Sequence, residues 1–221
     1  MAGAGMPGDN HRISIVGRTG SGKTYAALWH LAMRSWHRRP WIVFDFKGDK
    51  NIALIPGLEE VDIKKPPPRK PGIYVVRPLP TDDDAEAQVK FMWKIWENEK
   101  TGMYIDEGYM VGKNNAAFRA NLTQGRSKEI PMIILSQRPL WLDRFVWSEA
   151  DFFQVFHLST EDDRKVISRY LPVKSVERLP QYHSYYYDVG ADEIVTLRPV
   201  PDRDKIITMI EDRLKNRRNF L

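Results

Sequence analysis

The stretch GRTGSGKT, residues 17–24, constrains the fold of this chain more than any other. It matches the pattern G-x-x-x-x-G-K-[ST] in full. An apolar run at residues 12–17 precedes it, and "KTYAALWHLAMRSW", with apolar residues at helical spacing, follows it. A strand, a glycine-rich turn and a helix in this order form a loop that cradles phosphate groups. The sequence therefore predicts an α/β protein that binds a nucleotide.

The residue types in this loop suit the phosphates of ATP. The three glycines let the backbone curl so that its N–H groups point inward, where the helix N-terminus adds positive potential. Lys23 is expected to reach the β- and γ-phosphates, and the Thr24 hydroxyl to bind Mg²⁺. The alternative is a turn that contains Lys-Thr by chance, which the flanking strand and helix disfavour. The predicted nucleotide-binding set is Gly17, Arg18, Thr19, Gly20, Ser21, Gly22, Lys23, Thr24 and Tyr25.

Two carboxylates, Asp106 and Glu107, end the apolar run "GMYIDE" at residues 102–107. Ligands of open parallel sheets bind at the carboxyl ends of the strands. We expect Asp106 to hold Mg²⁺, and Glu107 to orient or deprotonate the water that attacks the γ-phosphate. The alternative is a pair of solvated acids in a loop. An acid that activates water favours a hydrolytic enzyme over a kinase, which must avoid that reaction.

Strand-like and helix-like patterns alternate along the chain. Strands are also predicted at residues 41–46, 73–78, 131–137 and 151–159, and helices at 82–100, 114–125 and 161–171, the last with Ser159 or Thr160 as its cap. "YHSYYYDV" and "EIVTLRPV" predict a hairpin, and residues 202–218 a last helix. The proline-rich connector 64–72 cannot form either element. The expected fold is α/β, with a mainly parallel central sheet flanked by helices, in a single domain (12–221) after a flexible N-terminus (1–11).

Composition excludes several kinds of site. The chain has no cysteine, so it has no disulfide, thiolate metal site or cysteine nucleophile, and its five histidines lack the spacing of a zinc site. No apolar run approaches the roughly 18 residues of a membrane helix, so we expect no membrane span. The net charge of +5 tolerates a polyanionic partner without requiring one.

Four segments in series carry a resemblance to a known family: "GRTGSGKT", "VFDFKGDK", "YIDEG" and "GRSKEIPMIILSQRP". Together they resemble the HerA–FtsK superfamily of DNA-pumping ATPases. Within it, the compact size resembles the genome-packaging ATPases of tailless, membrane-containing viruses. The resemblance covers residues 12–160 and implies a RecA-like phosphate-loop fold with an added catalytic glutamate, the ASCE class.

The resemblance also implies site residues outside the first two motifs. Strand 131–137 should lie between strands 12–17 and 102–107, which places Gln137 between the γ-phosphate and Glu107 as a sensor. The family forms rings, commonly hexamers, in which a neighbour's arginine completes each site. Arg126 matches that position, Arg119 is the second candidate, and Arg138 is expected to be structural.

A ring motor holds DNA through polar loops, mainly at its phosphates. Lys47, Lys50, Lys113, Asn114 and Asn115 are the candidate contacts, each with an ordinary solvated side chain as the alternative.

The first functional hypothesis is an ATPase that translocates double-stranded DNA during viral genome packaging. It would dock on a capsid vertex or portal and act in the host cytoplasm or at the virion vertex. The alternatives are a Zot-like, ATP-driven virus or filament assembly factor that acts on protein, and a small-molecule kinase. The sequence lacks "LSGGQ" and "NKxD", which weighs against ABC ATPases and GTPases.

Overall fold

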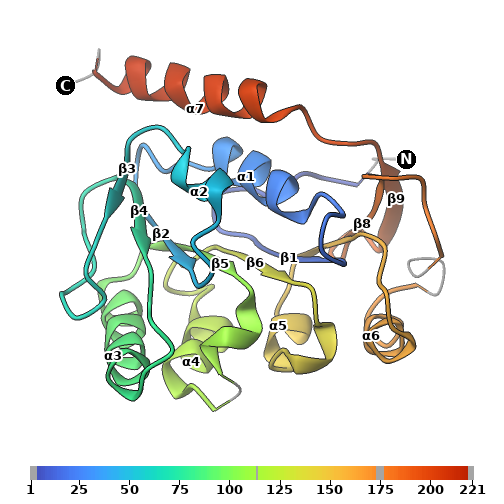
Figure 1. Cartoon of the computed structure of the whole chain (residues 1–221), viewed down its shortest axis with the longest axis horizontal. Coiled ribbons are helices and arrows are strands. Elements are labelled where there is room, and N and C mark those ends of the chain that lie inside the picture. The colour runs from blue at the N-terminus through green and yellow to red at the C-terminus, as the bar shows by residue number, and fades with distance from the viewer. Residues whose placement is uncertain (1–3, 113, 173–176, 219–221) are drawn as a thin grey trace.

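The computed structural model describes residues 4–112, 114–172 and 177–218, and a nine-stranded sheet forms its centre (Figure 1). The strand order is β3-β4-β2-β5-β6-β1-β7-β8-β9. Neighbouring strands from β3 to β7 in this order pair in parallel. Strand β8 pairs antiparallel with β7, and β9 pairs antiparallel with β8. The expected mainly parallel sheet with a C-terminal hairpin is therefore confirmed. The strands are β1 (Arg12–Val16), β2 (Pro40–Asp45), β3 (Leu58–Glu60), β4 (Gly72–Val76), β5 (Gly102–Asp106), β6 (Met132–Ser136), β7 (Phe152–Val155), β8 (Ser184–Asp188) and β9 (Glu193–Leu197).

Helices cover both faces of the sheet (Figure 1). Three lie on one face: α1 (Lys23–Met33), α2 (Lys50–Ala53) and α7 (Arg203–Arg218). Four lie on the other: α3 (Asp82–Asn98), α4 (Ala116–Gln124), α5 (Phe145–Ser148) and α6 (Glu161–Ile167). Two 3₁₀ turns, η1 (Gly108–Val111) and η2 (Pro139–Trp141), follow β5 and β6. This double covering explains the continuous apolar runs of the central strands, since both faces of each strand are buried.

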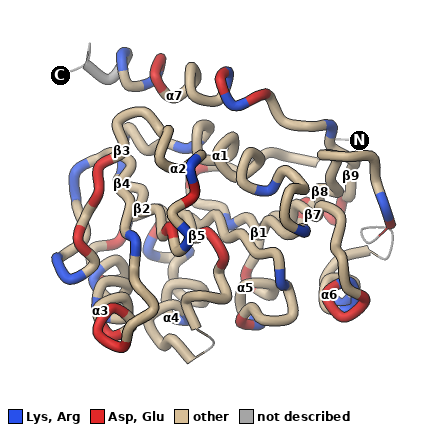
Figure 2. The backbone as a smooth tube through the Cα atoms, in the orientation of Figure 1, with Lys and Arg blue, Asp and Glu red and all other residues tan. Residues whose placement is uncertain are grey.

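Short polar side chains begin α3, α4 and α6 on the second face. Thr81, Asn115 and Thr160 each accept a hydrogen bond from a backbone N–H of the first turn of α3, α4 and α6. Acidic residues fill the first turns of α3 and α6, where Figure 2 shows them in red and where they complement the helix dipole. Thr160 therefore caps α6, as predicted. Asn115, expected among the DNA contacts, is instead a buried cap of α4.

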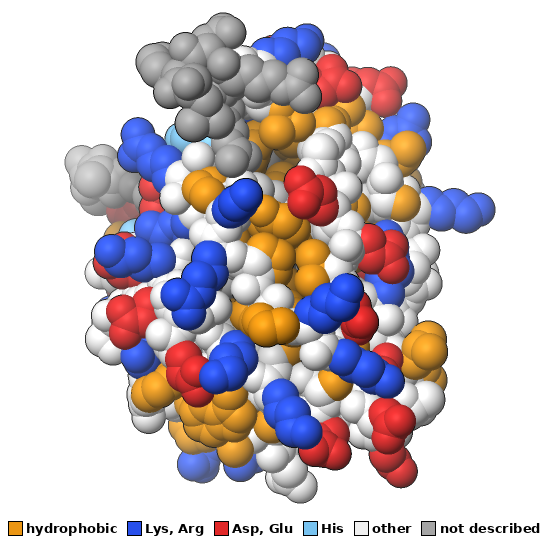
Figure 3. Space-filling view, turned by 90° about the vertical axis from the view of Figure 1, so that its left-hand side faces the viewer, with side chains coloured by type: hydrophobic (Ala, Val, Ile, Leu, Met, Phe, Trp, Pro, Cys, Tyr) orange, Lys and Arg blue, Asp and Glu red, His pale blue; other side chains and the backbone are white. Residues whose placement is uncertain are grey.

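The connector between β3 and β4 forms neither helix nor strand up to Gly72, as its prolines predict. It runs beside α3, with Lys64 paired to Asp84 at 3.6 Å and Arg69 donating to Asn98 at 2.6 Å. Basic and acidic side chains are interspersed on this side of the molecule (Figure 3).

The segment before β1 makes more contacts than a flexible terminus would. Residues 1–3 lie outside the described part. The Gly5 N–H donates to Asp188 at 2.9 Å, and its carbonyl accepts from the Tyr186 hydroxyl at 2.9 Å. Buried Arg34 donates to the Gly8 carbonyl. Residues 5–8 are thus fastened to the hairpin and to the end of α1, which the composition of the segment did not indicate.

The C-terminal helix α7 packs across α1. Ile206 and Ile210 are buried with the apolar face of α1, and Arg213 donates to the Arg34 carbonyl at 3.0 Å. The chain that leads from β9 into α7 therefore passes close to the first turn of α1. In the described part of the chain, no helix is both long and apolar enough to cross a membrane.

Candidate active site

The loop between β1 and α1 has the backbone that its glycines predict. Gly22, the residue before α1, has φ 104°, a left-handed value that disfavours a side chain. A Cβ at Gly17 would lie 2.5 Å from the Cβ of Phe156, so only glycine fits there. Lys23 is buried, and its ammonium donates to the Arg18 carbonyl of the same loop at 3.3 Å. Burial is the main cause that lowers the pKa of Lys23.

A cavity of about 710 Å³ opens at the carboxyl edge of the sheet beside this loop. Of the predicted nucleotide-binding set, the residues that line it are Thr19, Gly20, Gly22, Lys23, Thr24 and Tyr25. Gly17, Arg18 and Ser21 do not line it. Ser21 lies behind the loop, with its hydroxyl buried beside Gly17. The cavity thus lies where the sequence predicts the phosphates.

Asp106 and Glu107 both line the cavity from the end of β5. The pKa of Asp106 is raised to about 7, mainly by burial and also by the neighbouring Glu107 carboxylate. One oxygen of Asp106, Oδ2, is buried without a hydrogen-bond partner. Glu107 is almost fully buried and has a left-handed backbone, φ 60° and ψ 68°.

Mg²⁺ fits the donors at this edge. The described residues hold no group of three or more Asp, Glu, His or Cys side chains that could bind a metal alone. Mg²⁺ commonly takes one or two protein oxygens and completes its shell with phosphates and water. The unpartnered Asp106 oxygen and the Thr24 hydroxyl line the same cavity and are suited to that arrangement.

Strand β6 lies between β5 and β1, as the resemblance implied. Gln137 follows it directly and lines the cavity. Its backbone N–H donates to Glu107 Oε2 at 3.1 Å, and its side-chain carbonyl accepts from the Thr19 hydroxyl. Gln137 therefore links the phosphate loop to Glu107.

Two groups of cavity residues were missed by the sequence reasoning. Lys47, Asp49 and Asn51 come from the loop after β2 and the start of α2, and Lys47 forms an ion pair with Glu107. Lys47, one of the candidate DNA contacts, lies in the cavity. The "FKGDK" segment was noticed as a family mark, but nothing local to it indicated a contact with residue 107.

The second group comes from the C-terminal part of the chain. Residues 199–202 line the cavity because the path from β9 to α7 returns to the phosphate loop, and Tyr182, which precedes β8, lines it as well. With Phe156 they supply apolar surface suited to a nucleobase. Their sequence carries no motif, and the packing of α7 on α1 brings residues 199–202 here.

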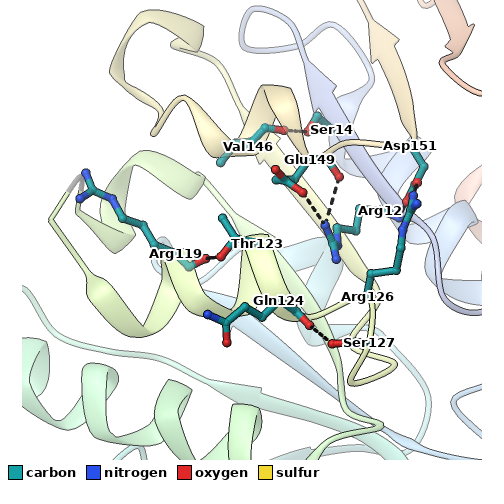
Figure 4. A network of polar contacts seen from close by, with 10 residues as sticks. All are labelled: Arg12, Ser14, Arg119, Thr123, Gln124, Arg126, Ser127, Val146, Glu149 and Asp151. Atoms are coloured by element: carbon teal, nitrogen blue, oxygen red, sulfur yellow. Dashed lines mark hydrogen bonds and ion pairs between the residues drawn. The ribbon is translucent and has the colours of Figure 1, made fainter.

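The candidate arginines lie outside the cavity of their own chain. Arg126 is paired with Asp151, which precedes β7 and also accepts from the N–H of Arg12, the first residue of β1. Arg126 is thus at the amino edge of the sheet, opposite the cavity, and its side chain is 69% exposed. Arg119 binds Asp143 at 2.6 Å and points away from Arg126 (Figure 4).

Arg138 has local partners, in keeping with the structural role expected of it. Its guanidinium lies 4.6 Å from the centre of the Trp141 ring and 3.9 Å from an Asp163 oxygen. It does not line the cavity.

Comparison with known proteins gives relatives along nearly the whole chain. No family model matches. The DNA packaging ATPase P9 of Enterobacteria phage PRD1 is 46% identical over 216 residues, covering 93% of this chain and 94% of P9. The genome packaging NTPase B204 of Sulfolobus turreted icosahedral virus 2, solved with AMP, superposes with a TM-score of 0.68 at 22% identity, covering 88% of this chain and 100% of B204. The N-terminal domain of zonular occludens toxin from Neisseria meningitidis gives 0.52 at 16% identity, covering 90% and 97%.

Proposed function

The chain belongs to the family of the viral DNA packaging ATPase P9 of phage PRD1, and from this we propose that it hydrolyses ATP to drive double-stranded DNA into a capsid. The observation that carries the proposal is the identity of 46% over 93% of the chain. The same chain has a cavity in which a phosphate loop, two carboxylates and a glutamine converge.

The chain's own residues have distinct tasks in this proposal. The loop N–H groups and Lys23 bind the phosphates, and the apolar surface of Tyr182 and residues 199–201 receives the base. Mg²⁺, held by Thr24 and Asp106, would neutralise charge on the phosphates. Glu107 orients the attacking water and takes its proton.

Gln137 couples the γ-phosphate to Glu107. Its backbone already holds the Glu107 carboxylate, and its side chain reaches the phosphate loop through Thr19. A change at the phosphate can therefore move Glu107 and the loop that follows Gln137 together.

Catalysis in this proposal takes place in a ring, commonly a hexamer, in which a neighbour supplies the arginine. Arg126 is our first candidate for that arginine, because it is exposed on the edge opposite its own cavity. Arg119 is the second. Lys50 and Asn114 remain candidates for DNA contact because both are exposed, and Lys113 lies outside the described residues.

The motor is further proposed to dock on a capsid vertex or portal, in the host cytoplasm or at the virion vertex. Residues 12–221 are proposed to act as one domain, which is supported by the cavity surface that residues 182 and 199–202 contribute. The similarity to zonular occludens toxin is at 16% identity and concerns the fold alone, so it does not favour the assembly-factor alternative.

Steady-state ATP hydrolysis with and without long double-stranded DNA tests the proposal, with Lys23→Ala as the blank. Hydrolysis should rise with DNA at low salt and the rise should fade as salt increases, because phosphate contacts release counterions. Hydrolysis indifferent to DNA at every salt concentration would contradict a DNA motor.

Glu107→Gln tests the assignment of the base. This variant should bind ATP but lose at least about a hundredfold in turnover, since general-base catalysis contributes about 10²–10⁴-fold. Wild-type turnover would refute the role of Glu107.

A further inference from the structure

We propose that Lys47 is a further phosphate-binding residue of the ATP site. When ATP binds, the Lys47 ammonium would break its ion pair with Glu107 and bind the γ-phosphate instead. Lys47 would thus hold Glu107 in the empty site and free it only when there is a γ-phosphate to cleave. This inference rests on the proposed function, because it assumes that Glu107 acts on water.

The loop that carries Lys47 is fixed by Asp45. Asp45 is the last residue of β2 and pairs in register with Asp106 of β5. Its carboxylate accepts from the N–H groups of Lys47 at 3.4 Å and Asp49 at 3.0 Å, and from Arg77 at 3.1 Å. The loop therefore folds back toward the end of β5, and this brings the Lys47 ammonium to Glu107.

Glu107 has a donor on each carboxylate oxygen. Lys47 binds Oε1, and the Gln137 N–H donates to Oε2 at 3.1 Å. The carboxylate is 3% exposed, so water has little access to the remaining lone pairs. In this arrangement an attacking water has no open position on Glu107, and the base is inactive.

Lys47 is free to leave. Its side chain is 43% exposed, and a lysine ammonium on a flexible stem can rotate to a new partner at little cost. Lys47 lines the same cavity as Lys23. A γ-phosphate carries more negative charge than a carboxylate, so it should compete successfully for the ammonium.

The exchange would distinguish ATP from ADP. The γ-phosphate of ATP would give Lys47 a new partner and open Oε1 of Glu107 to water. ADP has no such group, so Lys47 would stay on Glu107. The site would then return to its inactive arrangement when phosphate leaves.

The test compares the affinities of Lys47→Met for a non-hydrolysable ATP analogue and for ADP. Losing a charge-assisted hydrogen bond to the γ-phosphate should weaken binding of the analogue at least about tenfold. ADP affinity should stay within about twofold of wild type, a difference too small to represent a lost hydrogen bond. Lys65→Met is the matched control, because Lys65 is exposed, does not line the cavity and has no role in the proposed function. Lys47→Arg should recover part of the loss.

A double-mutant cycle with Glu107→Gln tests the exchange itself. In the wild-type background Glu107→Gln should raise affinity for the analogue, partly by releasing Lys47 and partly by removing a negative charge. In the Lys47→Met background only the second part should remain. Equal gains in both backgrounds, or equal losses of analogue and ADP affinity in a Lys47→Met chain that melts at the wild-type temperature, would overturn the proposal.

The two proposals fail in different measurements. Turnover by Glu107→Gln decides the role of Glu107 in hydrolysis. The ratio of analogue to ADP affinity involves no hydrolysis and decides the role of Lys47. A Lys47→Met chain that does not fold would lose both affinities, and Lys47→Arg then carries the test.

Discussion

Asp106 should destabilise the nucleotide-free protein when it ionises, and Asp106→Asn should remove that cost. The pKa of Asp106 rises from 3.8 to about 7 on folding, mainly through burial. Such a rise corresponds to about 4 kcal/mol of unfolding free energy as an upper value. The protonated acid is favoured in the folded state, so the contribution of Asp106 to stability is greatest below pH 4 and is lost as pH rises toward 7.

Urea denaturation without Mg²⁺ or nucleotide, at pH 5 and at pH 8, measures this effect. From pH 5 to pH 8, the unfolding free energy of Asp106→Asn should rise relative to that of wild type by up to about 3 kcal/mol. Asp162→Asn is the matched control, because Asp162 is exposed and should show no such gain. If Asp106→Asn keeps the pH dependence of wild type, burial of this charge is not costly and the reasoning fails.

The same carboxyl group links metal binding to protons. Mg²⁺ requires the ionised form, so binding of Mg²⁺ with nucleotide at pH 6 should release a proton from Asp106. Calorimetry in buffers of different ionisation enthalpy measures the release, and Asp106→Asn should abolish it.

Three further predictions concern the core, the phosphate loop and the proposed ring. Burial lowers the pKa of His30 to about 4, so stability should be lost as pH falls from 6.5 to 4, by up to about 3 kcal/mol; His30→Gln should lose that acid dependence in urea titrations, and an unchanged slope would contradict the assignment. Gly17→Ala should lower the unfolding free energy by about 1–3 kcal/mol, because its Cβ would meet Phe156; a wild-type melting temperature would show that the loop adapts. Arg126→Ala should leave ATP binding intact and lower hydrolysis at least about a thousandfold, whereas the same result for Arg119→Ala alone would transfer the trans role to Arg119.

The parts of the site that the sequence predicted are those with local signals. The phosphate loop and the paired acids lie in short motifs whose strands and helices can be recognised from periodicity. The position of β6, by contrast, came from the family resemblance, because periodicity does not give strand order.

The parts that were missed depend on contacts between distant residues. Lys47 is an ordinary loop lysine until the register of β2 with β5 brings it to Glu107. Asn115 could equally cap a helix or contact a ligand, and only the fold selects the cap. Strand β3, "LEE", has an apolar residue only at its start, and its two acids are exposed at the sheet edge. It therefore lacks the alternation of apolar and polar residues from which a strand is predicted.

The return of the chain to the phosphate loop has a consequence for synthesis. The cavity draws on residues from Thr19 to Asp202, so its surface is complete only after almost all of the described chain has left the ribosome. Contacts of such long range form late in folding. Nucleotide should therefore stabilise the finished molecule more than a nascent chain that lacks the last helix, whose packing on α1 holds residues 199–202 at the cavity.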